Sequence, residues 1–328
     1  MKSEDAPIGS DPTRNPIRIG ISACLLGEKV RFDGGHKHDR YLTQTLGPYF
    51  VWVPVCPEVE IGLGTPRETM RLELAEDGIR MVMPKSGRDL TRPMSEYARD
   101  RVEKLALEDL GGYILKSDSP SCGLMRVRVY GPSGMPSRAG RGLFAEALAN
   151  RFPYLPIEEE GRLCDPRQRE NWIERVFAYR RLQSLWGSRW TVQSLIAFHT
   201  AQKLVILAHS PKALKDLGRL VAGAKDLPRT ELRQKYHKHF MSSLAILATR
   251  GRHANVLQHM AGYLKTQLDE DSRRELSSLI DDYRTGEIPL VVPLTLLKHY
   301  VRRFDIPYLA GQVYLSPHPK ELALRNHV

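Results

Sequence analysis

The stretch Ile-Arg-Ile-Gly-Ile-Ser-Ala-Cys, residues 17–24, is a short β-type run that leads directly into a cysteine. The mostly apolar run Phe50–Val55 likewise ends at Cys56. A third run, Tyr113–Leu115, leads into the loop that holds Cys122. Parallel strands of one sheet bring their carboxyl ends to one edge, where open α/β sheets bind ligands. The sequence therefore predicts three thiols at one sheet edge, a pattern typical of a metal centre with one open position.

Strand and helix signals alternate through the first half of the chain. Asp77-Gly78 marks a hairpin, and Ser95 is expected to cap a helix that stops at Gly111-Gly112. Another helix is expected over residues 141–151. Such alternation with short connections predicts an α/β domain, a Rossmann-like parallel sheet covered by helices, with the hairpin as an insertion.

The pattern changes at Asp165-Pro166, which resembles a helix cap followed by proline at the first helical position. From this point an all-α domain is expected. Helix-like spacing covers residues 166–186, 191–209, 212–222, 229–249, 252–267, 271–284 and 293–303. We therefore expect a disordered leader (1–16), a first domain (17–164) and a helical second domain (165–328).

Composition places the chain among folded proteins of a reducing compartment. Its 328 residues are 41% hydrophobic, and no stretch approaches the length of a membrane span. The first residues are polar and lack the apolar core of a secretory signal. Four cysteines without close pairing do not suggest a disulfide framework. We expect a cytoplasmic protein.

The net charge of +11 is unevenly distributed. Residues 1–165 hold 23 Lys and Arg against 24 Asp and Glu, whereas residues 166–328 hold 26 against 14, a net charge of +12. A charge asymmetry of this size suggests a polyanion-binding module beside a neutral one. The alternative is a merely soluble basic domain.

The spacing of the first three cysteines, 32 and 66 residues, contains no Cys-x-x-Cys pair and does not favour a zinc ribbon. Three separated thiolates can instead hold a [4Fe–4S] cluster at three corners and leave one iron free. Three buried structural cysteines, or a Cys₃His zinc site completed by His36 or His38, are the alternatives. Cys164 lies away from any strand end and is expected to be a bystander.

Two polar residues near these cysteines are candidates for proton transfer. Glu58 lies two residues after Cys56, and Ser117 lies five residues before Cys122. At the same sheet edge a carboxylate can act as general acid or base, and a hydroxyl can relay a proton. A surface carboxylate and a serine that merely caps a turn are the alternatives.

Four motifs resemble those of the thiouracil desulfidase (TudS) family: Ile-Ser-Ala-Cys-Leu-Leu-Gly, Pro-Val-Cys-Pro-Glu, Gly-Leu-Gly-Thr-Pro-Arg-Glu and Lys-Ser-Asp-Ser-Pro-Ser-Cys-Gly. The resemblance covers roughly residues 17–160. It implies that Cys24, Cys56 and Cys122 bind a [4Fe–4S] cluster whose open iron takes the substrate sulfur. It also implies that Glu58 is the acid/base and Ser117 its helper, in a non-redox replacement of C=S by C=O that releases sulfide.

The second half resembles the helical domain fused to such desulfidases, through residues 198–210 and 293–300. The whole chain is similar to the two-domain RudS family, which implies desulfuration of 4-thiouridine in tRNA and RNA binding by the basic domain. A desulfidase of free thiouracil or thionucleosides remains an alternative. A non-enzymatic iron–sulfur sensor that binds nucleic acid is another.

Basic side chains of the second half are candidate phosphate contacts, because Lys and Arg supply most non-specific affinity for nucleic acids. They are Arg175, Arg180, Arg181, Lys203, Lys212, Lys215, Arg219, Lys235, Lys238, Arg302 and Arg303. The aromatic residues among them, Trp186, Trp190, Tyr236 and Phe240, are candidates for stacking on bases. The alternative is a solvated basic face over a core that contains these aromatics. His199 and His209 are expected to be hydrogen-bonded at a helix interface rather than to bind a metal.

Overall fold

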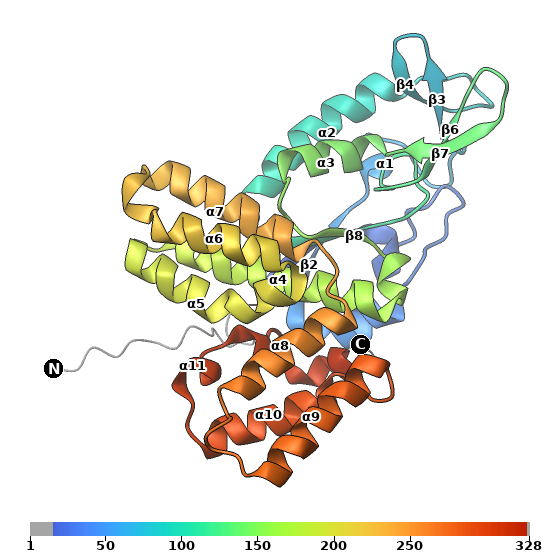
Figure 1. The fold of residues 1–328 in the computed structure, drawn as a ribbon. Helices are drawn as coiled ribbons and strands as arrows, with labels where there is room; N and C mark the ends of the chain where they lie inside the picture. Colours follow the sequence, from blue (N-terminus) through green and yellow to red (C-terminus); the bar gives the residue numbers. More distant parts are fainter. Residues whose placement is uncertain (1–15, 327–328) are drawn as a thin grey trace. The chain divides into compact units, whose positions relative to one another are not determined.

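The computed structural model describes residues 16–326, and the chain divides into two compact units at Cys164 and Asp165 (Figure 1). The disordered leader expected over residues 1–16 lies outside the described residues, apart from residue 16. No helix within residues 16–326 is long and apolar enough to cross a membrane.

The first unit contains a parallel four-stranded sheet in the order β2-β1-β5-β8. Its strands are β1 (Ile17–Ser22), β2 (Phe50–Val55), β5 (Leu110–Leu115) and β8 (Ile157–Glu159). Each neighbouring pair is parallel. The predicted parallel sheet is therefore confirmed, and both neighbours of β1 end at the edge where β1 ends.

Two glycines allow β1 and β5 to pack closely. A Cβ added to Gly20 would lie 2.1 Å from the ring of Tyr113, and one added to Gly111 would lie 2.2 Å from Cγ2 of Ile17. Gly111 is therefore a strand residue selected for space rather than a helix terminator. The expected helix end at Gly111-Gly112 is wrong.

The preceding helix, α2 (Thr91–Ala106), also begins four residues before the expected cap, Ser95. Its start is fixed by Asp89, whose carboxylate accepts the backbone N–H of Thr91 at 2.8 Å. The Thr91 hydroxyl in turn accepts the N–H of Met81 at 2.8 Å. Tertiary contacts with the neighbouring strand therefore set this boundary.

The predicted hairpin is confirmed, but it belongs to a second sheet instead of forming an insertion in the first. The strands β3 (Arg71–Ala75) and β4 (Gly78–Val82) pair antiparallel around Asp77. β3 then pairs in parallel with β6 (Val127–Tyr130), which pairs with β7 (Pro136–Gly140). The resulting mixed sheet has the order β4-β3-β6-β7 (Figure 1).

The helices of the first unit are short apart from α2. A 3₁₀ turn at Ala23–Leu26 follows β1, α1 (Pro57–Glu60) follows β2, and α3 (Leu143–Arg151) packs beside α2 (Figure 1). A π-helical segment covers Tyr41–Leu46. Further 3₁₀ turns lie at Gly47–Tyr49 and Arg162–Cys164.

The second unit is helical, as predicted. Its helices are α4 (Pro166–Gly187), α5 (Val192–His209), α6 (Pro211–Ala222), α7 (Arg229–Leu244), α8 (Arg250–Gly262), α9 (Glu270–Thr285), α10 (Val291–Arg303) and α11 (Pro307–Ala310). Short 3₁₀ turns lie at Ala224–Asp226, Val313–Leu315, Lys320–Leu322 and Leu324–Asn326. The expected cap is present: Asp165 accepts the backbone N–H groups of Arg167 and Gln168 at 2.8 and 3.2 Å.

Three of the four aromatics expected to stack on bases are buried in the core of this unit. Trp186 and Tyr236 lie 6.3 Å apart between ring centroids, and Tyr236 stacks on Phe240 at 5.9 Å. Their apolar surface is used by the fold, so these three residues cannot stack on a base. Trp190 alone of the four is partly exposed.

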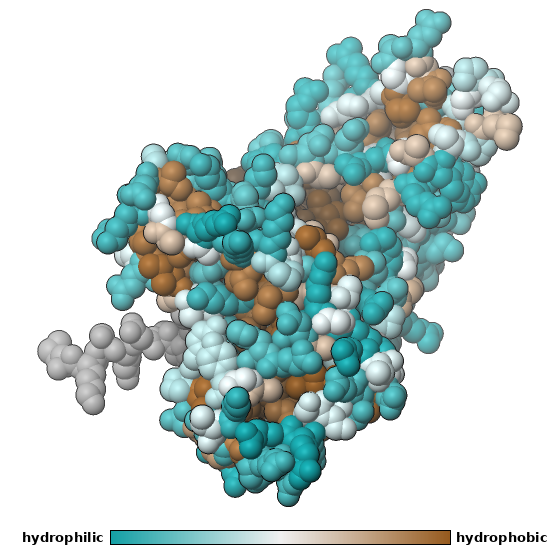
Figure 2. All heavy atoms as spheres, viewed as in Figure 1, coloured by the Kyte–Doolittle hydropathy of each residue, from teal (hydrophilic) through white to brown (hydrophobic). Residues whose placement is uncertain are grey.

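The basic residues proposed as phosphate contacts also include both buried and exposed side chains. Burial lowers the pKa of Arg181 to about 10, and its Nη2 donates to the carbonyl of Pro317 at 2.5 Å, so Arg181 is a structural residue and not a phosphate contact. The exposed candidates are Lys212, Lys215, Arg219, Lys235, Lys238, Arg302 and Arg303, on α6, α7 and α10. Figure 2 shows hydrophilic side chains over much of the visible surface of this unit.

The two histidines of α5 have the hydrogen-bond partners expected of interface residues. His199 Nδ1 lies 3.2 Å from the hydroxyl of Tyr236, and His209 Nδ1 lies 2.5 Å from the carbonyl of Ile246. A further buried histidine, His253, lies 2.8 Å from the hydroxyl of Tyr314. Burial lowers the pKa values of His199 and His253, because a charged imidazolium is disfavoured inside the unit. His209 differs, since its Nε2 also lies 3.5 Å from the carboxylate of Glu174.

We predict that acid destabilises the helical unit. Burial lowers the pKa of His253 to about 3, against 6.5 in an unfolded chain. Between these values the unfolded state binds more protons, so the free energy of unfolding falls as the pH drops below about 6.5, by about 1.4 kcal/mol per pH unit for this one site. Urea titrations followed by tryptophan fluorescence report on this unit, since three of the four tryptophans lie in it.

His253→Gln should lower the slope of unfolding free energy against pH by about 1.4 kcal/mol per pH unit. The control, replacement of the exposed His239 by Gln, should leave this slope unchanged. A slope of unfolding free energy against pH that is the same in wild type and in His253→Gln would contradict the prediction.

Candidate metal centre

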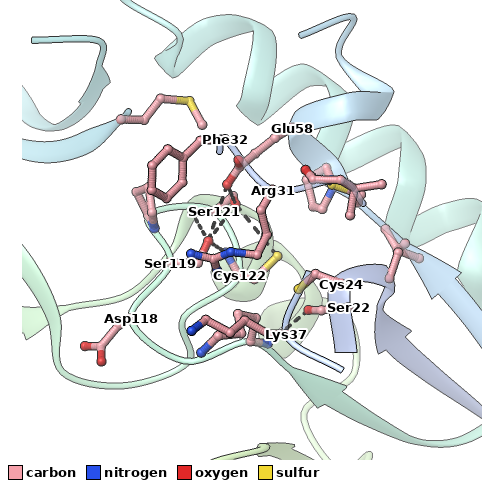
Figure 3. A pocket seen from close by; sticks show the side chains of 18 of the residues that line it. Ser22, Cys24, Arg31, Phe32, Lys37, Glu58, Asp118, Ser119, Ser121 and Cys122 are labelled. Atoms are coloured by element: carbon pink, nitrogen blue, oxygen red, sulfur yellow. Dashed lines mark hydrogen bonds between the residues drawn. The ribbon is translucent and has the colours of Figure 1, made fainter. Parts of the chain in front are cut away.

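The three cysteines after the strands of the parallel sheet line one cavity of about 300 Å³. Cys24 lies in the 3₁₀ turn after β1, Cys56 caps α1 after β2, and Cys122 lies in the loop after β5. All three are free thiols, and Cys24 and Cys122 are buried. Figure 3 shows the sulfur atoms of these two side chains facing the same space. The predicted meeting of the three thiols at one sheet edge is therefore observed.

Hydrogen bonds between the strand ends hold the cavity walls together. The backbone N–H of Lys116, directly after β5, donates to Oγ of Ser22 at the end of β1 at 3.0 Å. The hydroxyl of Ser119 accepts the N–H of Cys122 at 3.1 Å, which fixes the turn that carries this thiol. Gly142 packs against the same turn, because a Cβ there would lie 2.5 Å from the carbonyl of Ser121.

Neither histidine considered for a Cys₃His zinc site lines the cavity of the three thiols. No group of three or more His, Cys, Asp or Glu side chains within residues 16–326 is arranged to hold one metal ion. The alternative Cys₃His zinc site therefore has no geometric support, and His38 instead bonds Thr43 at 2.9 Å. A cluster spreads its irons apart and does not need thiols that converge on one point.

The surroundings of these thiols favour their neutral form when no cation is bound. Burial raises the pKa of Cys24 to about 11, and it raises the pKa values of Cys56 and Cys122 as well. The charge of the neighbouring Cys56 thiolate raises the pKa values of Cys24 and Cys122 further, because like charges close together disfavour ionisation. Cys164 is exposed and does not line the cavity.

The carboxylate of Glu58 lines the cavity and is held by hydrogen bonds on both of its oxygens. It lies in α1, two residues after Cys56, and Arg67 binds its Oε2 through Nε at 3.1 Å and through Nη2. Its other oxygen accepts the hydroxyl of Ser121 at 2.6 Å and lies 3.4 Å from the hydroxyl of Ser119 (Figure 3). Glu58 is thus oriented by a cation on one side and by hydroxyl groups on the other.

Ser117 lines the same cavity but makes different contacts. Its hydroxyl donates to Oε1 of Glu160 at 2.8 Å and accepts from Nζ of Lys116 at 2.9 Å. Lys116 and Glu160 also form an ion pair. The hydroxyls that contact Glu58 come instead from Ser119 and Ser121, and the role of Ser117 as the helper of Glu58 stays a prediction.

Sequence reasoning missed Ser119, Ser121 and Arg67 as partners of Glu58. The two serines stand within the Ser-Pro-Ser-Cys motif itself, so their nearness to Cys122 was a usable signal. Arg67 stands in Gly-Leu-Gly-Thr-Pro-Arg-Glu, another of the four motifs, which was a usable signal of a role at the site. Its pairing with Glu58 was not predictable, because it depends on how the chain turns after α1.

A cavity at the carboxyl edge of a parallel sheet, lined by three thiols and an oriented carboxylate, defines a candidate metal-dependent catalytic centre. Residues 19–160 match the family model described as 2-thiouracil desulfurase, and residues 203–319 match DUF1722, a family described as a protein of unknown function. The chain therefore belongs to the 2-thiouracil desulfurase family through its first unit, and its second unit carries a DUF1722 domain.

Two curated relatives and one solved structure are similar to the chain. YbgA of Escherichia coli (strain K12) is 35% identical over 46% of this chain and 90% of its own length. YbbK of Bacillus subtilis (strain 168) is 30% identical over 32% of this chain and 72% of its own length. The structure, described as the [4Fe-4S]-dependent thiouracil desulfidase TudS, matches with a TM-score of 0.37 and 30% identity, over 45% of this chain and 93% of that chain.

We predict that Gly142→Ala opens the turn that carries Cys122. The added Cβ would lie 2.5 Å from the Ser121 carbonyl and 2.9 Å from the Cys122 nitrogen, an overpacking that costs about 1–3 kcal/mol. Cys122 should therefore react faster with iodoacetamide, as measured by mass spectrometry of the metal-free protein. Gly131→Ala is the matched control, since nothing lies within 4 Å of its Cβ. Equal alkylation of Cys122 in both variants would contradict the prediction.

Proposed function

We propose that this protein is a [4Fe–4S]-dependent desulfidase that converts 4-thiouridine in tRNA to uridine. The observation that carries the proposal is the presence of three free cysteines and an oriented carboxylate in one cavity of a 2-thiouracil desulfurase domain. The cofactor is the one printed for TudS. The reducing cytoplasm that the cysteines suggest would suit such a centre.

Cys24, Cys56 and Cys122 would hold the cluster, since thiolates are the preferred ligands of iron–sulfur centres. When bound, a cluster with three protein ligands supplies a Lewis-acidic iron with a position open to sulfur. The chain gives this centre buried walls and an ion-paired carboxylate. Cys164 is left outside.

Glu58 is the proposed acid/base. Because Arg67 holds it in place, its carboxylate can take a proton from a water that attacks C4 of the thiolated base. Ser121, bonded to Glu58 at 2.6 Å, can pass that proton on. In the balanced reaction, water supplies the new carbonyl oxygen, the C=S bond breaks, and sulfur leaves as hydrogen sulfide; no electron is transferred.

The basic helical unit supports an RNA substrate. A free base needs no field of net charge +12, whereas phosphates attract one. The cavity of about 300 Å³ lies at the lower end of the range for ligand sites. It therefore suits one nucleotide, which would leave the RNA stack to enter it.

We predict that Cys24→Ala, Cys56→Ala and Cys122→Ala each lose the cluster, because each removes one of three thiolate ligands. Iron, acid-labile sulfide and the visible spectrum are measured after anaerobic reconstitution of the full chain. Activity is followed as loss of the thiocarbonyl absorbance of 4-thiouridine tRNA.

Cys164→Ala is the matched control and should keep both cluster and activity, since this thiol is exposed and outside the cavity. Cluster loss in Cys164→Ala would overturn the ligand assignment. A cluster-loaded wild type that leaves the tRNA absorbance unchanged would overturn the proposed activity and favour a non-enzymatic sensor.

We predict that Glu58→Gln lowers kcat by about 10²–10⁴-fold with the cluster retained, as expected for loss of a general acid/base. Ser121→Ala should lower kcat more than Ser117→Ala, because Ser121 contacts Glu58 whereas Ser117 contacts Glu160. The reverse order would assign the proton relay to Ser117. Undiminished kcat in Glu58→Gln would remove this carboxylate from the mechanism.

A further inference from the structure

The one-turn helix α1 carries two groups of the proposed site and depends on its surroundings for stability. Cys56 directly precedes its first residue, and Glu58 lies within it. Isolated helices shorter than about 12–15 residues are marginal in water, so a helix of 4 residues needs contacts with the rest of the unit. The contacts that hold α1 therefore decide where a proposed cluster ligand and the proposed acid/base lie.

Glu60, the last residue of α1, fixes the backbone of Cys56 on both sides. Its Oε1 accepts the N–H of Cys56 at 3.2 Å, and its own N–H donates to the carbonyl of Cys56 at 2.9 Å. A carboxylate that reaches back to the N–H in front of a helix acts like one half of a capping box. The thiol of Cys56 itself makes a weaker contact, at 3.8 Å from the carbonyl of Val30.

The second carboxylate oxygen of Glu60 joins α1 to α2, the two helices being in contact (Figure 1). Oε2 accepts the hydroxyl of Tyr97 at 2.7 Å and lies 3.1 Å from Nε of Arg101. Tyr97 and Arg101 stand four residues apart on α2 and therefore share one face of that helix. Burial and the bond to Glu60 raise the pKa of Tyr97, so its hydroxyl keeps the proton that it donates.

The α2 side of this contact is anchored in the core of the unit. The ring of Tyr97 lies 6.3 Å from that of Phe144, and Phe144 lies 6.1 Å from Tyr113 in β5. Phe144 and Tyr113 are fully buried. The hydroxyl that binds Glu60 is therefore carried by a ring in the packed layer between the helices and the parallel sheet.

These contacts act on the least enclosed of the three proposed ligands. Cys24 and Cys122 are buried, whereas Cys56 is half-buried. Glu58 lines the cavity and is held by Arg67, while Glu60 is held by α2 outside the cavity lining. The two carboxylates of α1 thus tie the same turn to two different parts of the unit.

We propose that Glu60 is a positioning residue for Cys56. With Tyr97 and Arg101 it forms a clamp that holds the Cys56 corner of the centre and keeps Glu58 facing the cavity. The clamp gives this corner the rigidity that packing gives to the two buried cysteines. The inference rests on the proposed ligand role of Cys56 and deepens it by naming the residues that maintain it.

A purely electrostatic role for Glu60 makes different demands. A carboxylate near a cluster changes the reduction potential of that cluster, and Glu60→Gln and Glu60→Ala remove the charge equally. A hydrogen-bonded clamp is lost in Glu60→Ala, whereas Glu60→Gln keeps an oxygen that can accept the N–H of Cys56.

The first test needs neither cluster nor turnover. The metal-free full chain is treated with iodoacetamide, and the alkylation rate of each cysteine is measured by mass spectrometry. Glu60→Ala should raise the rate at Cys56 by about tenfold, as expected for loss of one charge-assisted hydrogen bond. Glu60→Gln should restore most of the wild-type rate. The exposed Cys164 is the internal reference and should react equally in all variants.

Two further variants separate the clamp from a general loosening of α2. Tyr97→Phe removes one hydroxyl but keeps the ring, so it should raise the Cys56 rate less than Glu60→Ala does, because Arg101 still contacts Glu60. Glu103→Ala is the matched control. This exposed carboxylate also lies on α2, but it pairs with Arg151 of α3 at 2.7 Å, and its removal should leave Cys56 unchanged.

The second test uses the full chain after anaerobic reconstitution. Iron loss to EDTA should be faster in Glu60→Ala than in wild type and near the wild-type rate in Glu60→Gln. The reduction potential of the retained cluster is measured in both variants by a titration followed by electron paramagnetic resonance.

An unchanged Cys56 alkylation rate in Glu60→Ala overturns the proposal, and so does an equal rise in Glu103→Ala. Equal rises in Glu60→Gln and Glu60→Ala, with equal shifts in potential, assign Glu60 a charge effect and also overturn the clamp. If the alkylation rates follow the expected order but the wild type binds no cluster, the clamp on α1 stands and the proposed function fails.

Discussion

Parallel pairing of β1 with both β2 and β5 is the constraint on which the rest of the first unit depends. Because all three strands run in one direction, the residues that follow them emerge at one edge. Cysteines separated by 32 and 66 residues in sequence are brought to one cavity in this way. The pairing of β1 with β5 in turn requires Gly20 and Gly111, since a side chain at either position would collide with the neighbouring strand.

The cavity combines groups that would destabilise one another without specific partners. Three thiols and a carboxylate share a buried space, and burial raises the thiol pKa values. Arg67 offsets the carboxylate charge and also bonds the carbonyls of Val30 and Phe32, in the loop that forms the outer wall of the cavity. One side chain therefore couples the position of the Glu58 carboxylate to the outer wall of the cavity.

The features that follow from local periodicity were predictable from the sequence. The parallel strands, the hairpin at Asp77-Gly78 and the helices after Asp165 agree with the structure, because alternation, turn residues and caps are local signals. The helix end at Gly111-Gly112 was not predictable, since those glycines are selected by contact with a strand distant in sequence. The sequence left open whether Trp186, Tyr236 and Phe240 stack on bases or lie in a core, and in the structure they lie in the core. Sequence spacing could not decide between the two, because the packing partners of these aromatics come from other helices.

In the site, too, local signals were predictable from the sequence, whereas contacts that depend on the folded chain were not. The cysteines and Glu58 stand next to strand ends, so topology alone places them, but the choice among Ser117, Ser119 and Ser121 depends on how a six-residue loop bends. In that loop Lys116 and Glu160 hold Ser117, which leaves the serines that flank Pro120 to meet Glu58. Two carboxylate–serine–cation groups therefore lie in this part of the unit, but of the two carboxylates only Glu58 lines the cavity, and only its group has a serine next to Cys122. The hydroxyl of Ser121 thus lies 2.6 Å from the Glu58 carboxylate and 3.7 Å from the sulfur of Cys122, which is the arrangement that the proposed proton transfer requires.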